Sequence, residues 1–82
     1  MEIAELAQEL RNRYEHARRN EATCQVILFG ILYARELQTC GVPLREILEQ
    51  SGVSRGYLSE ISKGIKLSKY VIPREGENHG RN

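Results

Sequence analysis

The sequence predicts an all-α fold, a small helical domain of four to five helices that contains a helix-turn-helix. Two observations predict it: apolar residues recur at helical spacing over most of residues 2–63, and residues 43–63 divide into two short helices at a tight turn. A chain of 82 residues allows one domain with a small core. We therefore expect one domain over residues 1–72, followed by a flexible polar tail over residues 73–82, where the apolar periodicity is lost.

The N-terminal segment, residues 2–19, is predicted to form an amphipathic helix. Glutamates lie near its start and arginines near its end, an order that complements the helix dipole. Apolar residues recur along it at three- and four-residue steps, as a core-facing stripe requires: Ile3, Leu6, Leu10, Tyr14 and Ala17. One face of this helix should therefore pack against the rest of the protein.

A second helix is predicted over residues 21–39. Asn20 offers an N-cap, and Gly41 suits the position just past the helix end. Residues 26–33 are apolar on every face, which a solvent-facing helix would not tolerate. A buried strand is the competing interpretation of this run, but the flanking residues favour a helix. We expect it to be the central core helix, and part of it to contribute to a dimer contact.

The helix-turn-helix follows over residues 43–63. Pro43 fits the first turn of its first helix, which ends near residue 50, because the missing N–H would be unpaired there anyway. Gly52 suits the turn, since a residue without Cβ takes positive φ at little steric cost. Ser54 is a good N-cap for the following helix through its hydroxyl oxygen.

The second helix of the motif is predicted over residues 55–62, ending near Gly64. At ~100° per residue, Leu58, Ile61 and Ile65 share one face, which should pack against the core. The opposite face should be exposed, with Arg55 and Tyr57 at its flanks, and it carries Gly56, Ser59, Glu60 and Lys63.

Two descriptions fit residues 65–72. Ile65, Leu67 and Val71 alternate as in a strand, whereas Leu67, Tyr70 and Val71 have the spacing of a final helical turn. The apolar pattern does not choose between them.

Eight residues of the motif follow a set order of apolar residue, turn glycine, Val-Ser pair, Leu-Ser step, isoleucine and closing glycine: Ile47, Gly52, Val53, Ser54, Leu58, Ser59, Ile61 and Gly64. In this order and spacing the segment resembles the helix-turn-helix of the Cro and phage-repressor (Xre-like) family, over about a quarter of the chain. Two positions differ from that family's pattern: Leu48 stands where alanine is usual, and Ser51 where leucine is usual. A larger residue at position 48 pushes the two helices apart unless neighbouring side chains compensate.

The resemblance implies a DNA-binding domain whose second motif helix enters the major groove. Arg55, at the start of that helix, is the first candidate for sequence choice, because its planar fork can bond O6 and N7 of a guanine. The predicted base-reading residues are Arg55, Gly56, Ser59 and Glu60. The predicted phosphate-binding residues are Arg45, Ser54, Tyr57, Lys63, Lys66 and Lys69. Tyr57 is equally consistent with a packing role.

The resulting hypothesis is a sequence-specific regulator of transcription that binds double-stranded DNA, most often a repressor in phage- or plasmid-type relatives. Because one helix covers only a few base pairs, we expect a homodimer on a palindromic operator, with residues 2–19 and 26–33 as the candidate interface. Two alternatives stay open. One is a protein-interaction module, such as a small inhibitor or antirepressor, favoured by the net charge of +1 and by Glu60. The other is an architectural subunit that binds the DNA backbone.

Enzymatic and membrane functions are not expected. The chain has no aspartate, and its two histidines, His16 and His79, lack a nucleophile partner, so we predict no catalytic site, metal, cofactor or small-molecule substrate. No apolar run approaches the ~20 residues of a membrane span, and we expect a cytoplasmic protein. Cys24 and Cys40, ~24 Å apart if they share one helix, should be reduced thiols buried as small apolar residues.

Overall fold

The computed structural model describes residues 1–74 and contains, over this part of the chain, helices but no strand. These are five α-helices and one short 3₁₀ helix: α1 (Ile3–Glu15), α2 (Ala22–Leu32), α3 (Ala34–Thr39), α4 (Leu44–Ser51), η1 (Arg55–Tyr57) and α5 (Leu58–Leu67). The predicted all-α class is confirmed. None of the helices between residues 1 and 74 is long and apolar enough to cross a membrane.

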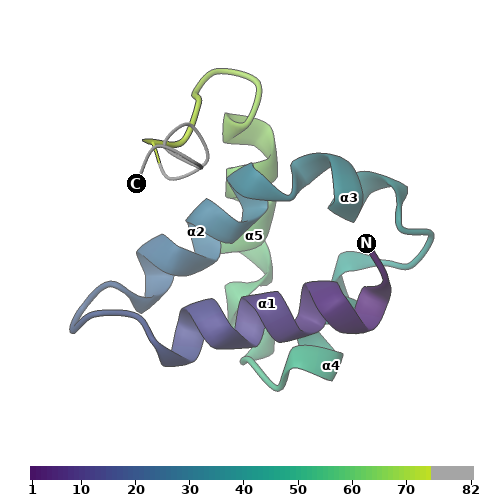
Figure 1. The fold of residues 1–82 in the computed structure, drawn as a ribbon, viewed down its shortest axis with the longest axis horizontal. Coiled ribbons are helices and arrows are strands. Elements are labelled where there is room, and N and C mark those ends of the chain that lie inside the picture. Colours follow the sequence, from purple (N-terminus) through teal and green to yellow (C-terminus); the bar gives the residue numbers. More distant parts are fainter. Residues whose placement is uncertain (75–82) are drawn as a thin grey trace.

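α2 and α5 cross at the centre of the fold (Figure 1). Two glycines, Gly30 and Gly64, lie where the helices cross. A Cβ atom on Gly30 would lie 2.5 Å from the carbonyl oxygen of Ile61 and 3.0 Å from the Cα of Gly64. A Cβ atom on Gly64 would meet the carbonyl oxygen of Ile27 more closely still. The two helix backbones therefore touch, and only glycine leaves room for this contact. Gly64 is a packing residue inside α5 and not the helix end that the sequence predicts.

α1 lies against α2 and α4 and closes the core (Figure 1). Every α-helix contributes buried side chains, and fully burying one large apolar side chain is worth about 1.5–3 kcal/mol. The core residues are Leu6, Ala7, Leu10, Val26, Phe29, Leu37, Ile47, Leu48, Val53 and Ile61. The predicted packing of the N-terminal helix by one face is thus confirmed.

α1 is shorter than predicted, because it ends at Glu15 instead of residue 19. At its start, the backbone N–H of Glu2 donates to the Glu5 carboxylate at 2.9 Å, which satisfies one of the free donors of a helix N-terminus. Asn20 then makes the turn to α2 with a φ of 66°, in the left-handed region that asparagine tolerates better than most residues. Asn20 is therefore a turn residue, and the N-cap of α2 is Glu21.

The predicted second helix is in fact two helices, α2 and α3, which meet at Tyr33. The backbone of Tyr33 has φ −112° and ψ 23°, outside the helical range. Helical hydrogen bonds nevertheless continue through the bend. The N–H of Tyr33 donates to the Phe29 carbonyl at 3.0 Å, and the carbonyl of Tyr33 accepts from the Leu37 N–H at 2.8 Å. Beyond the bend, Ala34 and Leu37 are buried. No proline or glycine stands at position 33, so the apolar pattern predicts one continuous helix.

The connection from α3 to α4 follows the predicted turn chemistry with a shift of one residue. Gly41 has a φ of 87°, as expected for a glycine just past a helix end. Pro43 is the N-cap of α4 and precedes the helix by one position, with φ −68° and ψ 152°.

α5 continues past its predicted end at residue 62 and runs to Leu67, followed by a turn over residues 68–70. Residues 65–67 are therefore helical, and the strand interpretation of residues 65–72 is wrong. Residues 75–82 of the predicted tail, which include His79, lie outside the described residues.

The two cysteines are free, but they do not occupy the predicted environment. Cys24 is exposed on α2, and Cys40 is partly buried just after α3. Because the helix bends at Tyr33, the two thiols do not lie on one helix. The predicted burial as small apolar residues is wrong for Cys24.

Candidate nucleic-acid interface

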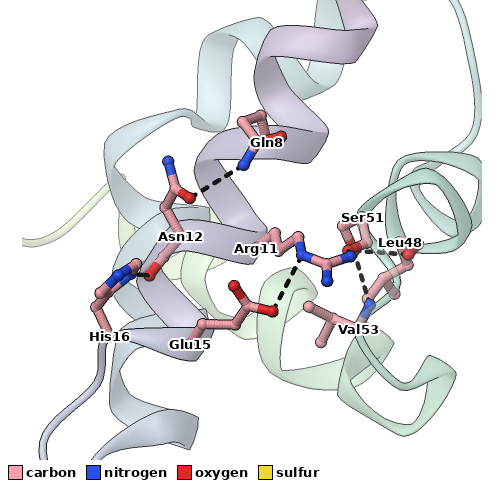
Figure 2. Close-up of polar contacts among 8 residues, drawn as sticks. All are labelled: Gln8, Arg11, Asn12, Glu15, His16, Leu48, Ser51 and Val53. Carbon is pink, nitrogen blue, oxygen red and sulfur yellow. Dashed lines mark hydrogen bonds and ion pairs between the residues drawn. The ribbon is translucent and has the colours of Figure 1, made fainter.

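Ser51 closes the turn between the two helices of the motif (Figure 2). Its side chain is buried, and its hydroxyl donates to the Leu48 carbonyl at 2.6 Å and accepts from the Val53 N–H at 3.1 Å. From α1, Arg11 donates to the Ser51 carbonyl at 3.4 Å and pairs with Glu15 at 3.0 Å. Buried polar groups of the backbone need such partners, and a leucine at this position has no hydroxyl to supply them.

Leu48 is fully buried, so the large residue at this position is a core residue. It is accommodated because α5 packs chiefly on α2 and touches α4 much less. Gly52 ends α4 with a φ of 79°, as predicted from the sequence. The packing of α5 on α2 therefore sets the orientation of α5, and the turn at Gly52 connects α4 to it.

The second helix of the motif begins as the 3₁₀ turn η1, before α5 proper. Ser54 is its N-cap, as predicted, because its hydroxyl oxygen accepts from the Gly56 N–H at 3.2 Å. In a 3₁₀ turn side chains three residues apart lie nearly above one another. Arg55 and Leu58 are three residues apart across this turn, and both line the surface described next.

One side of η1 and α5 is left uncovered by the described residues and carries a shallow depression of about 520 Å³. We call it the α5 outer face, and its residues are Arg55, Gly56, Leu58, Ser59, Ser62, Lys63 and Lys66. Six of these seven residues are exposed, and Ser62 is partly buried. The face unites five of the predicted site residues: Arg55, Gly56, Ser59, Lys63 and Lys66.

Leu58 does not pack as the helical wheel predicts. It is 37% exposed, whereas Ile61 on the same predicted face is fully buried and Ile65 is partly buried. Leu58 comes six residues before Gly64, ~9 Å along the helix, so it lies away from the crossing with α2. The prediction that Leu58 docks α5 onto the body is wrong, and Ile61 does this with Gly64.

The Glu60 side chain interacts with two neighbouring side chains on α5, Ser59 and Lys63. Its carboxylate accepts from the Ser59 hydroxyl at 3.0 Å and pairs with the Lys63 ammonium at 3.5 Å. Only 21% of the side chain is exposed. The Ser59 hydroxyl, and to a lesser degree Lys63, hold the pKa of Glu60 below its ordinary value, so the carboxylate is charged at neutral pH.

Tyr57 occupies a packing position. It is partly buried against the core, and its ring meets the Tyr14 ring edge-on with 5.4 Å between centroids. A hydrogen bond with Tyr57 is the main reason why the pKa of Tyr14 is raised. Of the two roles considered for Tyr57, this geometry favours packing.

The remaining predicted phosphate ligands lie outside the α5 outer face. Arg45 is exposed in the first turn of α4, Ser54 is exposed at the N-cap of η1, and Lys69 is exposed in the turn after α5. The structure therefore separates a central group of five predicted residues from these three.

A family model described as an HTH-like domain matches residues 2–74. The chain belongs to the HTH-like domain family. The match begins before α1 and ends past α5, so the unit shared by the family includes α1 to α3 as well as the motif itself. No curated protein and no solved structure matches this HTH-like domain.

Three features of the site in this HTH-like domain were not predicted. Ser62 lines the α5 outer face, Leu58 is exposed on it, and Arg11 reaches from α1 to the Ser51 carbonyl. The position of Ser62 could have been predicted from the sequence, because Ser62 follows Ser59 by three residues and thus lies on the same side of the helix. The other two depend on how α1 and α2 are placed in space, which the local pattern does not contain.

Proposed function

We propose that this HTH-like domain is a sequence-specific, double-stranded-DNA-binding regulator of transcription of the Cro and phage-repressor kind. The observation that carries the proposal is the α5 outer face, a helical surface with three basic side chains, Arg55, Lys63 and Lys66, that the described residues leave uncovered. An exposed helix fits the major groove, ~12 Å wide, where each base pair presents a distinct pattern of donors and acceptors.

The residues nearest the start of the helix are assigned to the bases. Arg55 is exposed in η1, and its guanidinium has the geometry to bond O6 and N7 of guanine. Gly56 leaves room for the backbone to approach the DNA, since nothing but the Ser54 hydroxyl lies within 4 Å of a Cβ placed there. Ser59 and Glu60 act as a bonded pair, in which Glu60 accepts from a cytosine amino group and penalises other bases.

Phosphate contacts are assigned to exposed groups around this centre: Arg45, Ser54, Lys63, Lys66 and Lys69. They supply affinity that does not depend on sequence and that falls as salt rises, because binding releases counterions from the DNA. Tyr57 is the least suited of the predicted ligands, since its ring is used in packing against Tyr14.

A homodimer on a palindromic operator completes the proposal, because two recognition helices ~34 Å apart read enough sequence for specific binding. Repression, by covering a promoter, is the expected outcome. The interface predicted on the apolar run of α2 has less free surface than the sequence implies, because Val26, Phe29 and Gly30 are buried within the subunit. We expect no catalytic role and a cytoplasmic location.

The proposal is tested by selecting bound sequences from a pool of randomised duplexes with the full-length protein. Enrichment of a palindromic sequence, whose affinity falls steeply as salt rises, supports the regulator. Binding with the same salt dependence but no enrichment would instead indicate an architectural role. Absence of duplex binding at low salt would overturn the proposal.

A protein-interaction module is the second candidate function, and one observation favours it. Large apolar side chains are exposed at and after the end of α5, beyond the basic centre: Leu67, Tyr70, Val71 and Ile72. Exposed apolar groups of this size are typical of protein contact sites. The near-neutral charge of the chain, +1, is also consistent with a protein partner.

A further inference from the structure

We propose that Leu58 reads the 5-methyl group of a thymine in the DNA site, next to the guanine assigned to Arg55. This inference rests on the proposed function and names a base that the proposed function leaves open. It starts from an apolar side chain that lies outside the buried core: Leu58 is 37% exposed, and the other side chains of the α5 outer face are polar or basic.

The position of Leu58 on this surface is central. Arg55, Ser59, Ser62 and Lys63 all line the same depression, on the turns before and after it. A duplex that approaches this face is drawn by its basic groups, and the charge is complementary to that of the phosphates. The docking of Arg55 against a base then brings Leu58 into the same groove.

The chemistry of the major groove leaves one partner for an aliphatic side chain there. Of the four bases, only thymine presents a methyl group in the major groove, while the other groups exposed at the base edges are hydrogen-bond donors and acceptors. Leucine offers neither a donor nor an acceptor. A cytosine amino group or a guanine oxygen facing Leu58 would lose water without gaining a partner, and thymine would not.

The spacing between the two readers sets where the thymine lies. Arg55 and Leu58 are three residues apart, which is roughly 5 Å along a helix whose first turn is 3₁₀. Successive base pairs are about 3.4 Å apart along the DNA axis. The thymine should therefore lie one or two base pairs from the guanine, on either strand.

The test uses the duplex selected by the full-length protein, with each thymine replaced in turn by uracil, which lacks only the methyl group. At one position near the guanine, we expect the affinity of the wild-type protein to fall about threefold to fivefold, the effect of one buried methyl group. Leu58→Ala should bind the thymine duplex with the same loss and should no longer distinguish uracil from thymine.

Two further variants serve as controls for the comparison of thymine with uracil. Leu67→Ala removes another exposed leucine of α5, 41% exposed but outside the α5 outer face, and should distinguish thymine from uracil as the wild type does. Leu58→Met keeps an aliphatic group and should retain the distinction. Thermal unfolding of each variant checks that the fold is unchanged, as expected for an exposed side chain.

Specific binding with equal affinity for thymine and uracil at every position would overturn this inference and leave the proposed function intact. The same holds if Leu58→Ala keeps the wild-type preference for thymine. Failure to bind any duplex would overturn the proposed function itself, and this inference with it.

Discussion

Arg55 and Lys66 mark the two ends of the α5 outer face, and their head groups differ in what they can recognise. We expect Arg55→Ala to lose about 1–3 kcal/mol of binding free energy on the selected duplex but little on random DNA. Lys66→Ala should weaken all duplexes about equally and lower the salt slope by about 1. Fluorescence anisotropy titrations at several salt concentrations measure both effects.

Arg35→Ala is the matched control for these two variants, because Arg35 is an exposed arginine on α3. It should change neither affinity nor salt slope. Equal losses on selected and random DNA for Arg55→Ala would contradict base recognition by that side chain.

The role proposed for Glu60 is to weaken DNA binding in general while it sharpens sequence choice. In Glu60→Gln the Lys63 ammonium loses its carboxylate partner at 3.5 Å and becomes available to a phosphate. We expect affinity for random duplexes to rise about threefold to tenfold, since one charge near a phosphate is worth about 1 kcal/mol in water-like surroundings. On the selected duplex the gain should be smaller, because the contact assigned to Glu60 with a cytosine is weakened. The salt slope should steepen by about 1.

Glu36→Gln makes the same charge change on α3 and should leave binding unaltered. If both variants raise affinity equally, the effect belongs to the net charge and not to the Glu60–Lys63 pair.

The hydroxyl of Ser51 is a stability feature of the turn. We expect Ser51→Ala to lower the free energy of unfolding by about 1–2 kcal/mol, because the buried Val53 N–H loses its acceptor. Thr39→Ala is the comparison: its hydroxyl makes a similar 2.8 Å bond to the Arg35 carbonyl, but it is exposed, so its loss should stay within about 0.5 kcal/mol. Urea unfolding of the two variants distinguishes these values, and equal losses would show that burial of Ser51 is irrelevant.

The crossing of α2 and α5 positions the whole α5 outer face. Gly64→Ala places a methyl group against the backbone of α2, where the Cα of Gly30 would lie at 2.9 Å and the N of Ile31 at 3.0 Å. We expect a loss of stability of at least about 1–3 kcal/mol, despite the higher helix propensity of alanine. DNA affinity should fall as well, since the helix must shift away from α2.

Gly56→Ala is the matched control for this crossing. Its added Cβ would meet only the Ser54 hydroxyl, at an ordinary 3.5 Å, so the free energy of unfolding in urea should equal the wild-type value or rise by up to about 1 kcal/mol. A stable Gly64→Ala protein with unchanged unfolding would contradict the close contact of the two helix backbones.

Much of the helical architecture could be predicted from the sequence. The positive-φ glycines at 41 and 52, the Ser54 cap and the buried stripe of α1 all follow from local rules of steric freedom, capping and periodicity. What could not be predicted depends on contacts between distant segments. The bend at Tyr33 carries no local signal, and the role of Gly64 depends on Gly30, which lies far away along the chain.

The candidate site was predictable to a similar extent. Helical spacing alone groups Gly56, Ser59 and Lys63, and the structure places them on one surface. The helical-wheel argument assigns Leu58 to the packed side because it assumes that the rest of the protein covers every turn of the helix equally. In the molecule, α2 covers α5 around Gly64 and leaves the first turn of α5 open. Ile61 is therefore buried and Leu58 exposed, although both belong to the same apolar stripe.

For the molecule as a whole, the arrangement separates a structural side from a free side. The core binds α1, α2, α4 and α5 together, and the basic side chains of α5 lie outside it. The total charge of +1 shows nothing of this separation, because the five basic residues between positions 55 and 74 are offset by acids elsewhere in the chain. For the proposed binding of DNA, we therefore expect the local charge of the α5 outer face to matter more than the net charge of the chain.

The most direct test is to map the DNA contact by amide hydrogen exchange or NMR chemical shifts, with the full-length protein titrated with its selected duplex. We expect the largest changes over residues 54–66 and no change over α3. Changes confined to residues 67–72, or to α1, with the α5 outer face unaffected, would contradict recognition of DNA by this helix.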